Sequence, residues 1–146
     1  MSSTESEKVK KNKAIVLRFI EEVQSQHKLD VADVLMDRNM VDHYFEMRGL
    51  PEPADAVKAF KEFYSKNILS AFPDAKAVVH EMVAEGDLVA TYKTTHVTHT
   101  GEFRGIAPTG KEGDIQIMDI FRIAEEKKVE HWGIVDFTSI TRKISS

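Results

Sequence analysis

The 146-residue chain contains no cysteine. This absence excludes disulfide bonds, a thiolate nucleophile and a thiolate-ligated metal. The chain does not need a covalent staple, because a domain of about this length buries roughly 68–70% of the surface that its unfolded chain exposes. We therefore expect a single domain that is held together by an apolar core.

Long apolar runs are also absent. No stretch reaches the ~20 apolar residues that a membrane-spanning helix needs. The opening MSSTESEKVKKNK holds no apolar core of signal-peptide length. We therefore expect a cytoplasmic protein without a membrane partner.

An excess of positive charge is absent as well, because 20 lysines and arginines face 24 aspartates and glutamates. The formal net charge is −4 and the isoelectric point is about 5.9, whereas nucleic-acid binding requires a clustered positive field. The basic residues between 8 and 13 follow Glu5 and Glu7, a mixture that favours a solvated helix over a nucleic-acid-binding arm. We expect no nucleic-acid partner.

The first half of the chain has helical periodicity. Thr4 and Glu7 match a capping box, and apolar residues then recur at helical spacing to about Gln26. A short second helix is predicted over 29–36 with Asp30 as its cap, a loop over 40–55, and a third helix from Ala56 to about Phe72.

The second half has the composition of strands. Strands are predicted over 75–87, 88–103, 114–123 and 128–137, with a tight turn at Glu125–Glu126 between the last two. Helices followed by strands predict an α+β fold, a largely antiparallel sheet with helices on one face. We divide the chain into a polar extension of the first helix, residues 1–10, and one domain, residues 11–146.

Asp119 is the central candidate for chemistry. On a strand, alternate side chains share a face, and the face that contains Asp119 is otherwise apolar: Ile115, Ile117, Phe121 and Ile123. If the turn is regular, Ala124 faces Lys127 and Asp119 faces Trp132. A carboxylate on an apolar wall is expected to have a raised pKa, which suits a general acid or base.

The same counting places Asp136 opposite Ile115, on the same face as Asp119. Two alternatives remain open. Each aspartate could instead accept backbone N–H groups at a strand end, and a β-bulge near Gly133 would exchange the faces and bring His131 inward.

Other polar residues are weaker candidates. Asp42, His43 and Tyr44 form either a polar cluster at a pocket mouth or a loop that bonds its own backbone. His96 and His99 are three residues apart on a strand, and so lie on opposite faces and are poorly placed to share a metal. We expect no metal site.

Several short motifs together resemble the SnoaL-like polyketide cyclase family, which is related to nuclear transport factor 2. The motifs are FPD (72–74), EGD (85–87), THTGEF (98–103), GIAPTGK (105–111) and EHW (130–132). The resemblance runs from about Lys11 to the C-terminus. It implies a cone formed by a curved sheet, closed by helices around a deep apolar cavity, and often a homodimer. Family enzymes close a ring by intramolecular aldol condensation without metal or cofactor, so we expect no cofactor.

The resemblance fails at the family's catalytic residues. The family's acid/base aspartate in the last strand aligns with Gly133, its supporting histidine with Asp119, and an asparagine after the second helix with Asp42. The last hairpin turn also differs, because the family usually has Asp-Gly where this chain has Glu125–Glu126. A type I′ turn is less favourable with two glutamates, because both central residues must adopt positive φ.

The leading hypothesis is therefore a protein that binds a small apolar, carbonyl-bearing molecule and acts, if it is an enzyme, as a cofactor-free cyclase or isomerase. Asp119 would be the general acid or base, with His43 or His131 as its proton partner. The expected ligand-binding residues are Asp42, Tyr44, Phe121, Trp132 and Asp136.

Two alternatives stay open. One is a non-catalytic binding or dimerisation scaffold of the same fold, which the loss of the cyclase aspartate favours. The other is an isomerase or epoxide hydrolase reaction in the same type of cone, although the residues that those reactions need cannot be assembled from the sequence.

Overall fold

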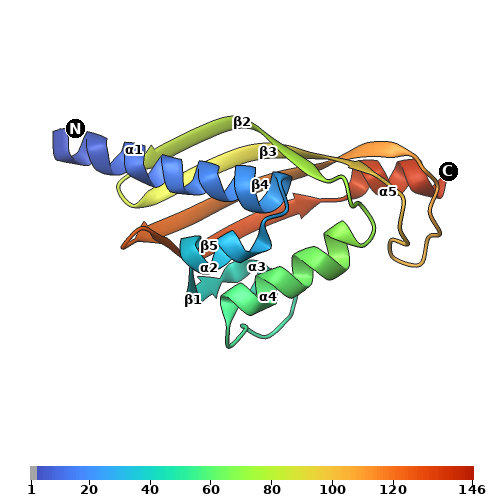
Figure 1. The fold of residues 1–146 in the computed structure, drawn as a ribbon, viewed down its shortest axis with the longest axis horizontal. Helices are drawn as coiled ribbons and strands as arrows, with labels where there is room; N and C mark the ends of the chain where they lie inside the picture. The colour runs from blue at the N-terminus through green and yellow to red at the C-terminus, as the bar shows by residue number, and fades with distance from the viewer. Residues whose placement is uncertain (1–2) are drawn as a thin grey trace.

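In a computed structural model, the chain forms a curved five-stranded sheet with helices on its concave side (Figure 1). The structure describes residues 3–146, so residues 1–2 of the predicted extension lie outside the described residues. The helical elements are α1 (Ser3–Arg18), a π-helical continuation (Phe19–Ser25), a 3₁₀ turn (Leu29–Val31), α2 (Ala32–Leu35), α3 (His43–Met47), α4 (Ala56–Phe63) with its π-helical continuation (Tyr64–Leu69), and α5 (Thr138–Ser145). The strands are β1 (Met36–Asp42), β2 (Lys76–Glu85), β3 (Leu88–Thr98), β4 (Glu112–Ala124) and β5 (Lys127–Asp136).

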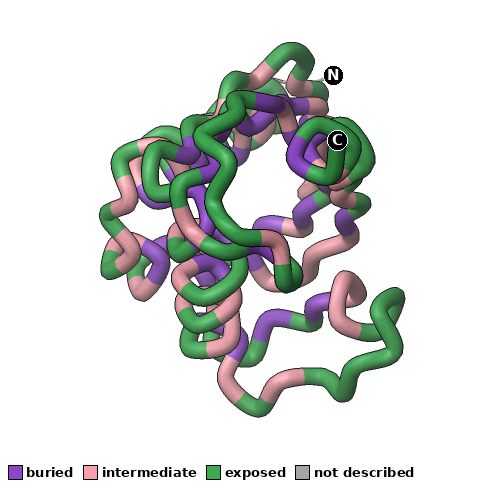
Figure 2. Tube along the Cα trace, turned by 90° about the vertical axis from the view of Figure 1, so that its right-hand side faces the viewer, coloured by how far each residue is buried: buried purple, intermediate pink, exposed green. Residues whose placement is uncertain are grey.

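The strand order is β1-β5-β4-β3-β2, and the sheet does not close on itself. All neighbours are antiparallel except β1 and β5, which run parallel. Seen along its long axis, the chain winds around a central interior (Figure 2). The predicted α+β fold with N-terminal helices over a curved, mostly antiparallel sheet is confirmed.

The first helix turns one apolar stripe toward the sheet. Val16, Phe19, Ile20 and Val23 recur at helical spacing and are at most 2% exposed. Such burial contributes about 1.5–3 kcal/mol for each large apolar side chain. No helix within residues 3–146 is long and apolar enough to cross a membrane.

Three local predictions were wrong. Helix α1 already includes Thr4, and Asp30 lies inside the 3₁₀ turn, so neither residue is the helix cap that its pattern suggested. Residues 36–42, predicted partly as loop, form β1, because they pair with β5 far along the chain. Helix α5 was not predicted, and it buries Ile140 and Ile144 one turn apart.

The β4–β5 hairpin begins as predicted and then departs from the regular register. Ala124 pairs with Lys127 and Ile123 with Lys128, but Arg122 pairs with Glu130, so one extra residue, Val129, forms a β-bulge. The turn residues Glu125 and Glu126 have φ values of 50° and 65°, the left-handed conformations of a type I′ turn.

The bulge corrects the predicted pairing of Asp119. Asp119 lies opposite Gly133, not Trp132, and Asp136 pairs with Gln116. A shift of one residue in the register of a strand moves every side chain beyond it to the other face of the sheet. Trp132 and Asp136 therefore point away from the face that holds Asp119. His131 takes their place on the inner face. The alternative with a bulge is therefore confirmed, although the bulge lies four residues before Gly133.

Candidate functional site

A cavity of about 100 Å³ lies between the helices and the inner face of the sheet. Because one water molecule needs roughly 10–15 Å³ of such space, the cavity has room for a small ligand. Its wall is mostly aromatic and aliphatic, including Phe19, Met40, Phe60, Tyr64, Ile117 and Val135. Five ionisable side chains interrupt this apolar wall: Asp42, Lys93, Asp119, Lys128 and His131.

Strand geometry brings the five groups together from four strands. The parallel pairing of β1 with β5 puts Asp42 beside His131. Lys128 and His131 are three residues apart, which on a regular strand would send them to opposite faces. The bulge at Val129 places both in the cavity wall.

His131 lies between two carboxylates. Its Nε2 is 2.7 Å from Asp119 Oδ1, and its Nδ1 is 2.9 Å from Asp42 Oδ1. The other oxygen of Asp119 is 3.0 Å from Lys93 Nζ, which also donates to Gln24 Oε1 at 2.8 Å. Both oxygens of Asp119 are therefore engaged.

This arrangement fixes the protonation of His131. Each ring nitrogen faces a carboxylate, and only the imidazolium form donates from both nitrogens. Burial alone would lower the pKa of His131, but the hydrogen bonds to Asp119 and Asp42 outweigh it and raise the pKa above 6.5.

The expected rise in the pKa of Asp119 was wrong in direction. Burial does favour the neutral acid, but the Lys93 ammonium and the His131 ring favour the carboxylate more strongly. The pKa of Asp119 is held well below its usual value of 3.8. Asp119 is consequently a poor proton acceptor near neutral pH. Its negative charge instead stabilises the positive charges of Lys93 and His131.

Gly133 makes room for this hydrogen-bonded cluster. A Cβ atom at position 133 would lie 2.7 Å from Asp119 Oδ1 and 2.7 Å from His131 Nε2. Both atoms would have to move away from the added carbon, and moving each one directly outward would also separate it from the other. The absence of a side chain at Gly133 thus leaves the space in which the Asp119–His131 contact forms.

Lys128 is also buried, with 3% of its surface exposed, but its surroundings differ from those of Lys93. Its Nζ lies 3.3 Å from the ring centroid of Phe19 and 3.9 Å from that of Phe121. Within residues 3–146 its Nζ has no hydrogen-bond or ion-pair partner. Burial lowers the pKa of Lys128 well below 10.5, and the charge on Lys93 lowers it further.

Five of the residues expected from the sequence line the cavity: Asp42, Tyr44, Asp119, Phe121 and His131. The main-chain N–H of Tyr44 donates to Asp42 Oδ1 at 3.0 Å, which fixes the start of α3. The Phe121 ring stacks on the His131 ring with centroids 4.7 Å apart. Tyr44 also borders a neighbouring hollow whose rim includes Arg48 and Arg104.

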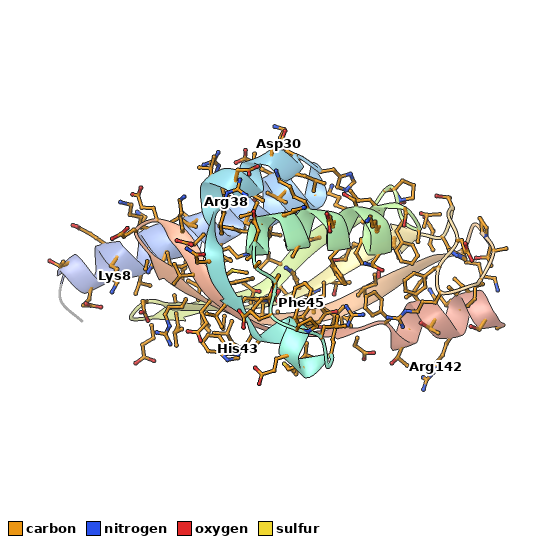
Figure 3. All side chains as sticks on the ribbon, turned by 90° about the horizontal axis from the view of Figure 1, so that it is seen from below. Lys8, Asp30, Arg38, His43, Phe45 and Arg142 are labelled. Atoms are coloured by element: carbon orange, nitrogen blue, oxygen red, sulfur yellow. The ribbon has the colours of Figure 1, made fainter. Side chains whose placement is uncertain are left out.

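The other three expected residues lie elsewhere. His43, labelled at the start of α3 in Figure 3, stacks on Trp132 with ring centroids 4.9 Å apart, and its Nε2 lies 2.8 Å from Glu130 Oε2. This group faces outward, because Trp132 is on the far side of the sheet from Asp119. Asp136 is exposed and accepts the Thr138 main-chain N–H at 2.8 Å, so it stabilises the start of α5.

Lys93 and Lys128 were missed by the sequence reasoning. Lys93 had a detectable signal, because it alternates with Val89, Thr91 and Val97 on one face of a strand. Lys128 had no such signal, because regular alternation along the strand would place its side chain on the other face of the sheet from His131. Within the described residues, no group of three or more potential ligands is placed to hold a metal ion.

Comparisons with known proteins agree with this architecture. IdmH from Streptomyces antibioticus, a candidate polyketide cyclase, superposes with a TM-score of 0.79 at 24% identity over 92% of this chain and 99% of its own. AclR from Streptomyces galilaeus, a candidate hydroxylase, superposes with a TM-score of 0.78 at 24% identity over 94% and 82%. At these identities the likeness shows the fold alone, and the two neighbours differ in proposed activity.

A search of curated proteins found no match. The family model for SnoaL-like polyketide cyclases matches residues 14–144, which include every strand of the sheet and all five ionisable residues of the cavity. The chain belongs to the SnoaL-like polyketide cyclase family.

Proposed function

We propose that the cavity binds a small apolar, carbonyl-bearing molecule and removes a proton next to its carbonyl group, without a cofactor, as the first step of a cyclisation or isomerisation. The observation that carries the proposal is the charged cluster around His131 in an otherwise apolar wall. Such convergence of perturbed ionisable groups on an apolar pocket is typical of active sites.

Enolisation requires a hydrogen-bond donor to the carbonyl oxygen and a base that takes the proton from the neighbouring carbon, and the cluster contains candidates for both. Lys93 has a third N–H beyond the two that face Asp119 and Gln24. A carbonyl oxygen that accepts a hydrogen bond from this N–H would acquire negative charge at lower cost, which makes the adjacent C–H more acidic. A carboxylate can then take the proton.

Asp42 is better suited than Asp119 to the role of base. Asp42 Oδ1 accepts from His131 and from the Tyr44 main chain, and within residues 3–146 its Oδ2 has no hydrogen-bond partner. Asp119 has no free oxygen, so we assign it the role of holding His131 in its protonated form. This reverses the roles expected from the sequence.

The test is hydrogen–deuterium exchange at the acidic carbon of a small β-keto ester in D₂O, followed by NMR. The wild-type protein should accelerate exchange over buffer, and Asp42→Asn and His131→Gln should each abolish most of the acceleration, of the order of 10²-fold or more for a general base. Asp136→Asn is the matched control, because Asp136 lies outside the cavity. Equal rates for wild type, Asp42→Asn and buffer would reject the proposal.

A non-catalytic role remains the second candidate, because Gly133 occupies the position of the family's acid/base aspartate. Ligand binding by thermal shift, with no exchange above buffer in any variant, would favour it.

We also propose that two copies associate through the outer face of the sheet. Val83, Met118 and Ile134 are each at least 60% exposed on this face, around a shallow hollow of about 480 Å³. Contiguous exposed apolar surface of this kind is typical of an interface. Sedimentation should show a dimer that Ile134→Lys dissociates, whereas Val34→Lys, on α2, leaves the mass unchanged; a monomeric wild type would refute this proposal.

A further inference from the structure

Two buried lysines line the same cavity, and within residues 3–146 one of them, Lys93, forms an ion pair while the other, Lys128, does not. Lys93 Nζ is 3.0 Å from Asp119 Oδ2 and is 1% exposed. Lys128 is 3% exposed, and its Nζ lies over the faces of the Phe19 and Phe121 rings, with no hydrogen bond or ion pair to any of residues 3–146. The two lysines therefore form an internal comparison of a paired and an unpaired amine.

The charges of the cluster are already balanced without Lys128. Lys93 and protonated His131 carry two positive charges, and Asp42 and Asp119 carry two negative charges. A charged Lys128 would add an uncompensated ammonium to an apolar wall, which is unfavourable because the charge loses its hydration without gaining a counter-ion. The Phe19 and Phe121 ring faces attract a cation, but they neither neutralise its charge nor accept conventional hydrogen bonds from its three N–H groups.

Loss of a proton from Lys128 would restore the balance and leave a neutral amine with a free lone pair. The lowered pKa that burial produces agrees with this charge count. A desolvated lysine in a hydrophobic pocket is the usual form of an amine nucleophile toward carbonyl groups. Lys93 cannot play this role while its nitrogen is protonated and bonded to Asp119.

We propose that Lys128 is a covalent carbonyl-binding site, whose Nζ condenses with one carbonyl group of a 1,3-dicarbonyl ligand to form a neutral enaminone. This inference rests on the proposed carbonyl ligand in the cavity, and it adds the chemical class of that ligand and the atom that captures it.

The condensation is balanced within the cavity. The Nζ lone pair forms a bond to the carbonyl carbon, the carbonyl oxygen takes up two protons, one from Nζ and one from the central carbon of the ligand, and it leaves as water. The product is an N–C=C–C=O system with one N–H. Because no net charge is created, the apolar wall of Phe19 and Phe121 disfavours this product far less than a cationic iminium.

A 1,3-dicarbonyl ligand is also the class that fits the rest of the cluster. Its second carbonyl oxygen stays conjugated to the nitrogen and accumulates negative charge, which the third N–H of Lys93 can stabilise. A simple ketone would leave a cationic iminium and no such oxygen.

The experiment uses the full chain and pentane-2,4-dione, a small 1,3-diketone. Protein is incubated near neutral pH, the enaminone absorbance is followed, and intact mass and peptide mapping locate the adduct. We expect one adduct per chain, with the mass of the diketone less one water, at Lys128. The exposed lysines should remain unmodified, because they are protonated at this pH.

Variants separate the nucleophile from the binding site. Lys128→Met should abolish the adduct while the diketone still shifts the unfolding temperature, because methionine keeps the length and apolar character of the side chain. Lys127→Arg is the matched control on the neighbouring position and should leave the adduct unchanged. If Lys128→Met does not fold, the peptide map of the wild-type adduct still identifies the modified nitrogen.

Adducts on exposed lysines with none on Lys128 would overturn the inference. A thermal shift by the diketone without any adduct would also overturn it, while leaving the proposed carbonyl-binding function intact. Neither shift nor adduct, together with no exchange activity toward the β-keto ester, would reject both.

Discussion

The replacement Gly133→Ala tests the geometry of the site with a single methyl group. The new Cβ would lie 2.7 Å from both Asp119 Oδ1 and His131 Nε2, whereas ordinary contacts begin at 3.4 Å. Each atom must therefore retreat by about 0.7 Å. If each atom moves directly away from the new Cβ, their separation grows from 2.7 Å to about 3.4 Å, which is beyond the usual range of an N–H···O hydrogen bond.

The sign of the change in unfolding free energy shows which of two opposing effects is larger. One is the stabilisation that alanine gives by restricting the unfolded chain, and the other is the loss of the Asp119–His131 hydrogen bond. Gly133 does not have a positive φ, so alanine at an unconstrained strand position should stabilise the protein by about 0.4–1 kcal/mol through the unfolded chain. Loss of a hydrogen bond between charged groups costs about 1.5–3 kcal/mol. We therefore expect the free energy of unfolding to fall by about 1–2 kcal/mol.

The assay is urea unfolding of wild type and variant, together with an NMR titration of the His131 ring. The pKa of His131 should fall in Gly133→Ala, because the ring moves away from Asp119. In a His131→Ala background the obstructing ring is absent, so Gly133→Ala should cost much less, as a double-mutant cycle would show. A Gly133→Ala variant that is more stable than wild type and has an unchanged His131 pKa would refute the reasoning.

Three further predictions concern pH, the hairpin turn and the last helix. Because the pKa of His131 is raised above its unfolded value of 6.5, its stabilising contribution is complete below pH 6.5 and is lost as the pH rises through the folded pKa, with a slope of up to about 1.4 kcal/mol per pH unit; urea unfolding of His131→Gln should lack this component. Replacing Glu125–Glu126 by Asn-Gly should raise the thermal unfolding midpoint by roughly 2 °C, because both residues have positive φ; an unchanged or lower midpoint would contradict this. Asp136→Ala should lower the thermal unfolding midpoint, because it removes the acceptor for the Thr138 N–H. It should leave the exchange activity and the diketone labelling unchanged, and a loss of labelling would indicate that Asp136 takes part in ligand binding.

Local patterns predicted most of the helices and strands. The stripe of Val16, Ile20 and Val23 has helical spacing and is buried. The alternation around Asp119 correctly placed that residue on the inner face of β4. These patterns are reliable because they depend on residues that are neighbours in the sequence.

The partners of Asp119 could not be predicted in the same way. The bulge at Val129 has no distinctive residue to mark it, yet it moves Trp132 outward and His131 inward. Asp42 reaches His131 only because β1 runs parallel to β5, a pairing between segments nearly ninety residues apart. Register is a property of the pair of strands and not of either strand alone.

The sequence by itself determined the fold class, the family and the presence of one inward carboxylate, Asp119, because periodicity and short motifs carry that information. Only the tertiary structure decided which groups surround this carboxylate and which of them are charged. Protonation depends on burial and on partners from other strands. Two lysines of identical chemistry therefore differ: Lys93 forms an ion pair with Asp119, whereas burial lowers the pKa of Lys128, which has no ion-pair partner within residues 3–146.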